Sequence, residues 1–236
     1  MTDFTVIAHR GASGYEPENT LRSFRRALEM GAGWVELDVH VTAGGELIVF
    51  HDDRLDRRTD GTGLVADRSL AYIRSLDAGE GEKIPLLGEV MDLISGRAGI
   101  NIELKGDRTA LPVAALLSER IRDGGWNPEW ILVSSFNHSE LTEFKARRPE
   151  IPLGALFGNA PACLDSVKYQ MGCYSVHVAR NSVTNVTVEE AHRLGMKVFV
   201  YTVNRRRDME RMKDLEVDGV FTDYPDRFIR ERPDGM

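Results

Sequence analysis

The sequence has few cysteines, no long apolar run and no surplus of basic side chains. Its 236 residues include 2 cysteines, Cys163 and Cys173, too few for a disulfide scaffold and in a spacing that matches no zinc-binding pattern. We expect both to be packed in or near the core. No stretch approaches the roughly 20 apolar residues of a membrane-spanning helix. With 30 basic against 37 acidic side chains and a net charge of -7, the chain is not expected to bind nucleic acid.

The N-terminal segment also lacks the features of an export signal. MTDFTVIAHRG has no basic stretch followed by a long apolar one. Apolar residues make up 42% of the chain and charged residues 28%, which is typical of an ordinary globular protein. We therefore expect a cytoplasmic protein without a membrane span; nothing in the sequence predicts its oligomeric state.

Strand and helix patterns alternate along most of the chain. Apolar runs predict strands near residues 4–8, 34–41, 46–51, 99–105, 130–134, 153–157, 175–178, 197–203 and 219–222. Helical periodicity predicts helices near residues 20–30, 86–95, 110–123, 138–147, 187–194 and 206–215. About eight main-sheet strands with helices between them, in a chain close to the ~250 residues usual for the fold, predict an α/β protein, a (β/α)8 TIM-type barrel.

An open, doubly wound sheet is the alternative architecture. It predicts a glycine-rich nucleotide or phosphate loop after the first strand, and the sequence has neither GxGxxG nor a Walker loop. The barrel is therefore favoured. Residues about 52–85 are polar and rich in Arg and Asp. We interpret them as a small insertion after the second barrel strand, within a single domain that spans residues 1–236.

Polar side chains gather near the carboxyl ends of the predicted strands, which converge on one rim of a β/α barrel. Glu36 and Asp38 lie two residues apart on a strand and project from one face, and Glu103 holds a comparable position on the next main-sheet strand. Three converging carboxylates repel one another unless a cation lies between them. Oxygen ligands favour Mg²⁺, Ca²⁺ or Mn²⁺ over zinc. The alternative is a structural ion network in which Arg10 or Lys105 pairs with these acids.

Two histidines, His9 and His51, each end a strand-like run. Because histidine titrates near neutral pH, two of them on opposite sides of a substrate can act as base and acid in turn. A single histidine at a strand end is more often structural, as we expect for His177. Beside three carboxylates, the pair favours catalysis. Arg10 and Lys105 could bind an anion, since the guanidinium fork fits phosphate oxygens.

At these residues the sequence resembles the glycerophosphodiester phosphodiesterase family. Six motifs in order carry the resemblance: His9-Arg10-Gly11 with Pro17-Glu18-Asn19-Thr20, Glu36-Leu37-Asp38-Val39, His51-Asp52, Glu103-Leu104-Lys105, Tyr201-Thr202-Val203-Asn204, and the run from Asp218 to Pro225. They extend over residues 6 to 226, nearly the whole chain. The resemblance implies a β/α barrel with a small insertion after the His-Asp pair. It also implies metal-dependent hydrolysis of glycerophosphodiesters to sn-glycerol 3-phosphate and an alcohol.

By position, the resemblance implies that Glu36, Asp38 and Glu103 hold a divalent metal, Mg²⁺ or Ca²⁺. It implies that His9 and His51 are the acid/base pair. The expected partner is a small-molecule glycerophosphodiester, and the expected setting is glycerol and lipid metabolism.

The resemblance further implies that Arg10 and Lys105 bind the substrate phosphate. Tyr201 stands where many relatives have Trp, so it belongs to a possible substrate pocket. Two alternatives stay open at this point: a non-catalytic barrel that binds phosphate esters, and a metal-dependent barrel lyase that uses Lys105 as its base. Asn19 is predicted as the N-cap of the first helix, and Glu18 as a residue that orients the site.

Overall fold

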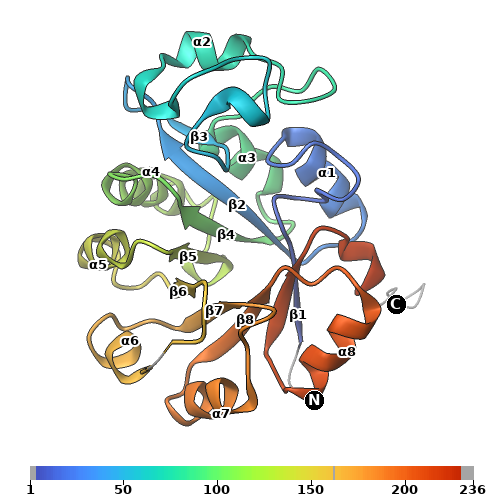
Figure 1. Ribbon diagram of the computed structural model, residues 1–236. Coiled ribbons are helices and arrows are strands. Elements are labelled where there is room, and N and C mark those ends of the chain that lie inside the picture. Colours follow the sequence, from blue (N-terminus) through green and yellow to red (C-terminus); the bar gives the residue numbers. More distant parts are fainter. Residues whose placement is uncertain (1–3, 162, 230–236) are drawn as a thin grey trace.

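Parallel strands close into a barrel with helices on its outside (Figure 1). The computed structural model describes residues 4–161 and 163–229. The barrel strands are β1 (Thr5–Ala8), β2 (Trp34–Val41), β4 (Gly99–Leu104), β5 (Ile131–Ser135), β6 (Leu153–Phe157), β7 (Ser175–Ala179), β8 (Lys197–Tyr201) and β9 (Gly219–Thr222). Neighbouring barrel strands pair in parallel, and β1 pairs with both β9 and β2, which closes the ring. The predicted TIM-type barrel is confirmed.

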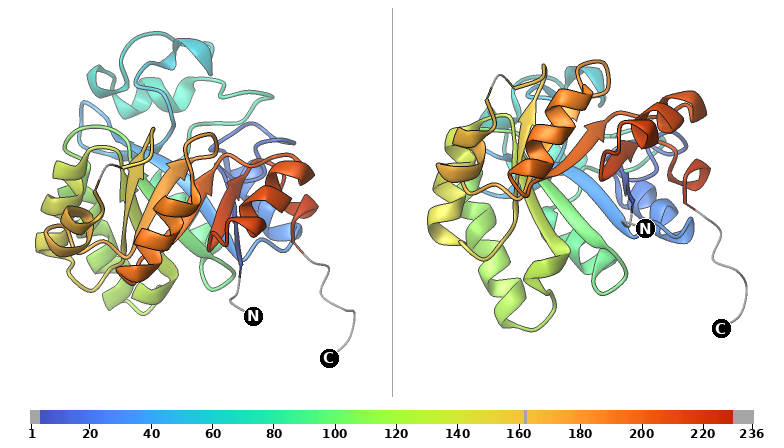
Figure 2. Two further views of the ribbon diagram at one scale, coloured as in Figure 1. Left: turned by 60° about the horizontal axis from the view of Figure 1, so that its bottom comes forward. Right: turned by 90° about the horizontal axis from the view of Figure 1, so that it is seen from below.

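Helices follow the strands and cover the outer face of the barrel (Figure 2). They are α1 (Leu21–Glu29), α3 (Leu87–Ile94), α4 (Ala110–Arg122), α5 (His138–Arg147), α6 (Asp165–Tyr169), α7 (Asn185–Arg193) and α8 (Arg206–Asp214). Short 3-10 helices lie at η3 (Pro128–Trp130) and η4 (Pro225–Arg227). Outward side chains of β2 such as Val35, Leu37 and Val39 are fully buried in the layer between strands and helices. This burial explains why the strands are apolar on their outer face.

The start of α1 differs from the prediction. Thr20, not Asn19, is the N-cap, and its side chain and that of Ser23 form a reciprocal capping box. Asn and Thr both rank among the preferred N-cap residues, so the local pattern did not separate them. Asn19 instead adopts a left-handed conformation, with φ of 59°, and its side chain turns toward the barrel rim. Gly31, with φ of 81°, follows the C-cap residue Met30.

The insertion lies between β3 (Leu47–Val49), which pairs antiparallel with β2, and α3. It contains η1 (Leu55–Arg57), η2 (Val65–Asp67) and α2 (Leu70–Ser75), and Figure 1 shows it beyond the carboxyl end of β2. With Ile48 of β3, its apolar side chains form a small cluster distinct from the main core: Phe50, Leu55, Val65, Ile73, Leu76 and Ile84. A separate cluster of this kind holds the insertion together over the rim.

The barrel interior is closed by a separate apolar cluster of Ile7, Leu132, Phe199 and Phe221. Of the two cysteines, Cys173 is buried as predicted, but Cys163 is exposed, so its packing prediction is wrong. Among the described residues, no helix is both long enough and apolar enough to cross a membrane.

Candidate active site

A cavity of about 290 Å³ opens at the carboxyl ends of the barrel strands. The side chains that line it include most of the residues singled out in the sequence: His9, Arg10, Glu36, His51, Glu103, Lys105 and Tyr201. Asp38 joins this group through its contacts with Arg10 and Lys105. The convergence follows from the fold, because the carboxyl ends of all barrel strands meet at one rim.

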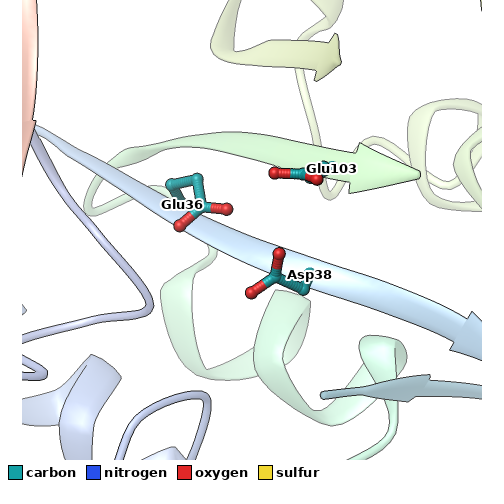
Figure 3. Close-up of side chains that lie close together, drawn as sticks. All are labelled: Glu36, Asp38 and Glu103. Atoms are coloured by element: carbon teal, nitrogen blue, oxygen red, sulfur yellow. The ribbon is translucent and has the colours of Figure 1, made fainter. Parts of the chain in front are cut away.

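The three carboxylates form one buried cluster (Figure 3). Glu36 and Asp38 project from β2, and Asp38 lies in register with Glu103 on β4. Each residue offers an oxygen within 4.8 Å of those of the other two. Their exposures are 2%, 1% and 8%, which leaves water little access. The alternation of the two neighbouring strands therefore brings the three acids together, as the spacing predicts.

Burial and mutual repulsion change the acidity of this cluster. Burial raises the pKa of Glu36 well above its ordinary value, and the Asp38 charge raises it further. The same causes raise the pKa of Glu103 to about 7. Asp38 Oδ1 is buried and has no hydrogen-bond partner within the described part of the chain. Closely spaced buried oxygens, one of them unpaired, fit a hard divalent cation.

Two cations border the cluster. The backbone N–H of Arg10 donates to Glu36 Oε2 at 2.9 Å, and the guanidinium Nε of Arg10 lies 3.2 Å from Asp38 Oδ2. Lys105 Nζ donates to Glu103 Oε1 at 2.9 Å and lies 3.8 Å from Asp38 Oδ1. Burial alone would raise the pKa of Asp38, but the charges of Arg10 and Lys105 outweigh it and lower that pKa. The structure thus contains ion pairs of the kind that the sequence suggests as an alternative to a metal site.

Lys105 is poorly suited to act as a base. Burial would lower the pKa of its ammonium group, but Glu103 and Asp38 raise it above the ordinary lysine value. A lysine must lose its proton before it can accept one from a substrate. These contacts therefore argue against the lyase alternative.

Both histidines are held by a carboxylate at Nδ1. His9 Nδ1 lies 2.7 Å from Asp223 Oδ1, and His51 Nδ1 lies 2.6 Å from Asp52 Oδ1. The guanidinium of Arg57 donates two hydrogen bonds to the Asp52 carboxylate, of 2.7 and 2.6 Å. Nε2 of each ring has no hydrogen-bond partner among residues 4–161 and 163–229. A carboxylate at Nδ1 fixes the tautomer in which Nε2 can accept a proton.

The pKa values of these groups are consistent with that arrangement. Burial opposes ionisation of Asp223, but the contacts with His9, Asn204 and Ser13 together outweigh it and lower its pKa to about 2. The bonds from Arg57 lower the pKa of Asp52 below its ordinary value. Burial lowers the pKa of His51, which favours its neutral form. The sequence motifs contain both aspartates, but only the structure pairs each with its histidine.

Three further side chains support the site. Asn19 Nδ2 donates to Asp38 Oδ2 at 2.9 Å, a role that the predicted N-cap did not anticipate. Glu18 Oε1 accepts from Arg10 Nη1 at 2.9 Å, in line with its predicted orienting role. Tyr201 lines the cavity and donates from its hydroxyl to the carbonyl of Phe157 at 2.8 Å. These contacts fix the orientation of groups that border the cavity.

Comparison with known proteins agrees with this geometry. Residues 9–227 match the glycerophosphoryl diester phosphodiesterase family model. A glycerophosphodiester phosphodiesterase from Caldanaerobacter subterraneus subsp. tengcongensis is 39% identical over 233 residues, covering 95% of this chain and 96% of that protein. One from Bacillus subtilis is 36% identical over 250 residues, covering 94% of this chain and 84% of that protein.

A solved structure has the same fold. The Oleispira antarctica phosphodiesterase in complex with the product sn-glycerol-3-phosphate superposes with a TM-score of 0.88 and 35% identity, covering 94% of each chain. Family match, full-length relatives and barrel geometry point to the same assignment. The chain therefore belongs to the glycerophosphoryl diester phosphodiesterase family and is an enzyme of that class.

Proposed function

We propose that the enzyme hydrolyses glycerophosphodiesters to sn-glycerol 3-phosphate and an alcohol, with a divalent cation and a histidine pair. The observation that carries the proposal is the single cavity that brings His9 and His51 to the acidic cluster of Glu36, Asp38 and Glu103. The Oleispira antarctica phosphodiesterase was solved with sn-glycerol-3-phosphate as its product, which supports the same product here.

Glu36, Asp38 and Glu103 would hold the cation, and their oxygen ligands favour Mg²⁺ or Ca²⁺. When bound, the ion supplies positive charge that stabilises the charge that develops on the phosphoryl oxygens. Its presence also offsets the repulsion that raises the pKa of Glu36 and Glu103. Asn19 holds Asp38 Oδ2 in place, which leaves Oδ1 free to act as a ligand.

Arg10 and Lys105 would bind the phosphate group. A phosphodiester carries one negative charge, and its transition state concentrates charge on the non-bridging oxygens. Lys105 has three N–H donors and gives one of them to Glu103. Arg10 is fixed by Glu18 and by its contact with Asp38, so its guanidinium is pre-oriented at the cavity.

His9 and His51 would move the protons. The Nε2 atom of one imidazole takes a proton from the attacking hydroxyl, either water or the glycerol 2-hydroxyl. If the 2-hydroxyl attacks, a cyclic phosphate forms first, and water then opens it to sn-glycerol 3-phosphate in a second step in which the two imidazoles exchange roles. The new P–O bond forms as the bond to the alcohol breaks, and Nε2 of the other imidazole protonates the departing oxygen. Asp223 and Asp52 stabilise the imidazolium that forms in each step. Acid/base assistance of this kind contributes about 10²–10⁴-fold to the rate.

The experiment is a product assay. The enzyme is incubated with glycerophosphocholine and Mg²⁺ or Ca²⁺, with and without EDTA, and released sn-glycerol 3-phosphate is measured. We expect release that EDTA abolishes and that His51→Gln reduces by about 10²–10⁴-fold. His192→Gln is the matched control, because His192 also bonds an aspartate, Asp218 at 2.8 Å, but lies outside the cavity. Chelator-insensitive release, or no release with any common headgroup, would contradict the proposal.

The non-catalytic binding barrel considered as an alternative is not supported, because the chain belongs to a family of phosphodiesterases. A cytoplasmic location and a place in glycerol and lipid metabolism stay predictions from the sequence.

A further inference from the structure

The floor of the cavity carries polar atoms that the proposed mechanism does not use. Asn101 on β4 and His177 on β7 line the cavity and are only 1% and 0% exposed. Asn101 Oδ1 and His177 Nδ1 are both buried without a hydrogen-bond partner among the described residues. Unpaired buried polar atoms are costly and rare in folded proteins, so each calls for a partner that the chain does not supply.

Asn101 lies deeper in the barrel than Asp38 and Glu103. Asn101 is in register with Glu36 and precedes Glu103 by two residues, so it occupies the next inward-facing position below Glu103. Its Nδ2 donates to Ser134 Oγ at 3.1 Å, which fixes the amide plane. The apolar cluster of Ile7, Leu132, Phe199 and Phe221 fills the barrel interior below this level. The cavity is therefore closed at its inner end.

The imidazole of His177 is positioned with similar specificity. Its Nε2 bonds Ser175 Oγ at 2.9 Å. A Cβ atom at residue 154 would lie 2.4 Å from that nitrogen, so Gly154 leaves the space that the ring occupies. Burial lowers the pKa of His177 to about 3, which keeps the ring neutral, with one donor and one acceptor nitrogen. Leu156 and Phe221 add apolar wall beside it.

We propose that Asn101 and His177 form a hydroxyl-binding floor that takes the glycerol end of the diester and leaves the alcohol end at the open rim. This inference rests on the proposed function. Arg10 and Lys105 would hold the phosphate nearer the mouth, so one ester substituent must extend inward. A glycerol group offers hydroxyls to both unpaired atoms, whereas a choline or alkyl ester group has no donor and would leave Asn101 Oδ1 unpaired.

The outer side of the site fits the remaining substituent. A second cavity of about 580 Å³ lies between the insertion and the loop before α1, and His51 lines both cavities. This outer groove is more open and includes the exposed side chains of Arg57 and Arg58. The floor therefore selects the polyol strictly, and the groove accepts alcohols of different size.

The test compares two ligands of equal chain length by calorimetry in saturating Mg²⁺: sn-glycerol 3-phosphate and n-propyl phosphate, which has no hydroxyl groups. We expect the wild-type enzyme to bind the first at least about tenfold more tightly. Asn101→Leu preserves side-chain size. It should reduce the ratio of the two dissociation constants to below about threefold, because it weakens the binding of sn-glycerol 3-phosphate alone. A wild-type ratio near one, or an unchanged ratio in the variant, overturns the inference; the second result would mean that water satisfies Asn101.

Ser135→Ala is the matched control. Ser135 is a buried serine next to Ser134, but its hydroxyl donates to the Leu104 carbonyl at 2.6 Å, so the ratio should not change. If Asn101→Leu melts too early to assay, His177→Phe carries the same expectation. Hydrolysis of glycerophosphocholine by the wild type separates the two proposals. Hydrolysis together with a ratio of dissociation constants near one refutes the floor alone, whereas no hydrolysis of glycerophosphocholine or of any other common glycerophosphodiester refutes the proposed function.

Discussion

His9 and Asp223 are 214 residues apart in the sequence, yet His9 Nδ1 lies 2.7 Å from Asp223 Oδ1. The pair forms because β1 and β9 are neighbours in the closed barrel. Asp223 is itself fixed by Asn204 Nδ2 at 2.6 Å and by Ser13 Oγ at 3.0 Å. The last strand of the barrel thereby orients a candidate catalytic group at the end of the first.

Asp223→Asn should lower kcat by about 10²–10⁴-fold, because an amide can hold His9 in the wrong tautomer. KM should change little, since the carboxylate does not line the cavity. Steady-state release of sn-glycerol 3-phosphate gives both constants. Asp218→Asn is the control, as Asp218 holds a histidine away from the cavity. A variant with unchanged kcat would remove His9 from the proton-transfer chemistry.

Divalent ions should stabilise the enzyme more at about pH 8 than at about pH 6. The pKa of Glu103 in the folded protein is raised to about 7, so the folded state holds a proton there that the unfolded chain has already lost. In the metal-free protein, the contribution of Glu103 to the free energy of unfolding therefore falls as pH rises from about 4.5 toward 7. A bound cation competes with that proton and restores stability where the carboxylate is ionised.

Melting temperatures in Mg²⁺ and in EDTA at the two pH values measure this effect. Glu103→Gln should remove most of the difference, because the amide does not titrate. An ion-induced rise in Tm of equal size at both pH values would contradict the assignment of Glu103 as a ligand.

Asn19 should tune metal affinity through Asp38. Asn19→Gly keeps the left-handed backbone, with φ of 59°, but removes the donor to Asp38 Oδ2. Loss of such an orienting contact lowers metal affinity by about 10–100-fold. Asn19→Ala adds backbone strain, so it should lose melting temperature as well. Ion titration of both variants separates the two effects, and wild-type affinity in Asn19→Gly would show that the amide only shapes the loop.

Much of the site could be predicted from local patterns. Glu36, Asp38 and Glu103 share one face of neighbouring strands, so period-two alternation and a parallel barrel suffice to bring them together. Asn101 lies on that same face, two residues before Glu103, and the alternation could have identified it too.

Other contacts could not be predicted locally. The pairing of His9 with Asp223 depends on ring closure between the first and last strands, which no local window contains. Asn19 was misassigned because capping preference is a property of the helix start alone. Its actual partner, Asp38, lies on another element, and only the turn with positive φ directs the amide there.

The most direct test of the account follows binding and catalysis together as Mg²⁺ or Ca²⁺ is added to the EDTA-treated enzyme. We predict that sn-glycerol 3-phosphate release rises with occupancy of a divalent-ion site. Glu36→Gln should weaken ion binding and shift the activation curve by the same factor, at least about tenfold. The melting temperature of the metal-free variant should change little. Full activity without the ion, or wild-type binding and activation in Glu36→Gln, would contradict the central claim that the three carboxylates hold the ion required for hydrolysis.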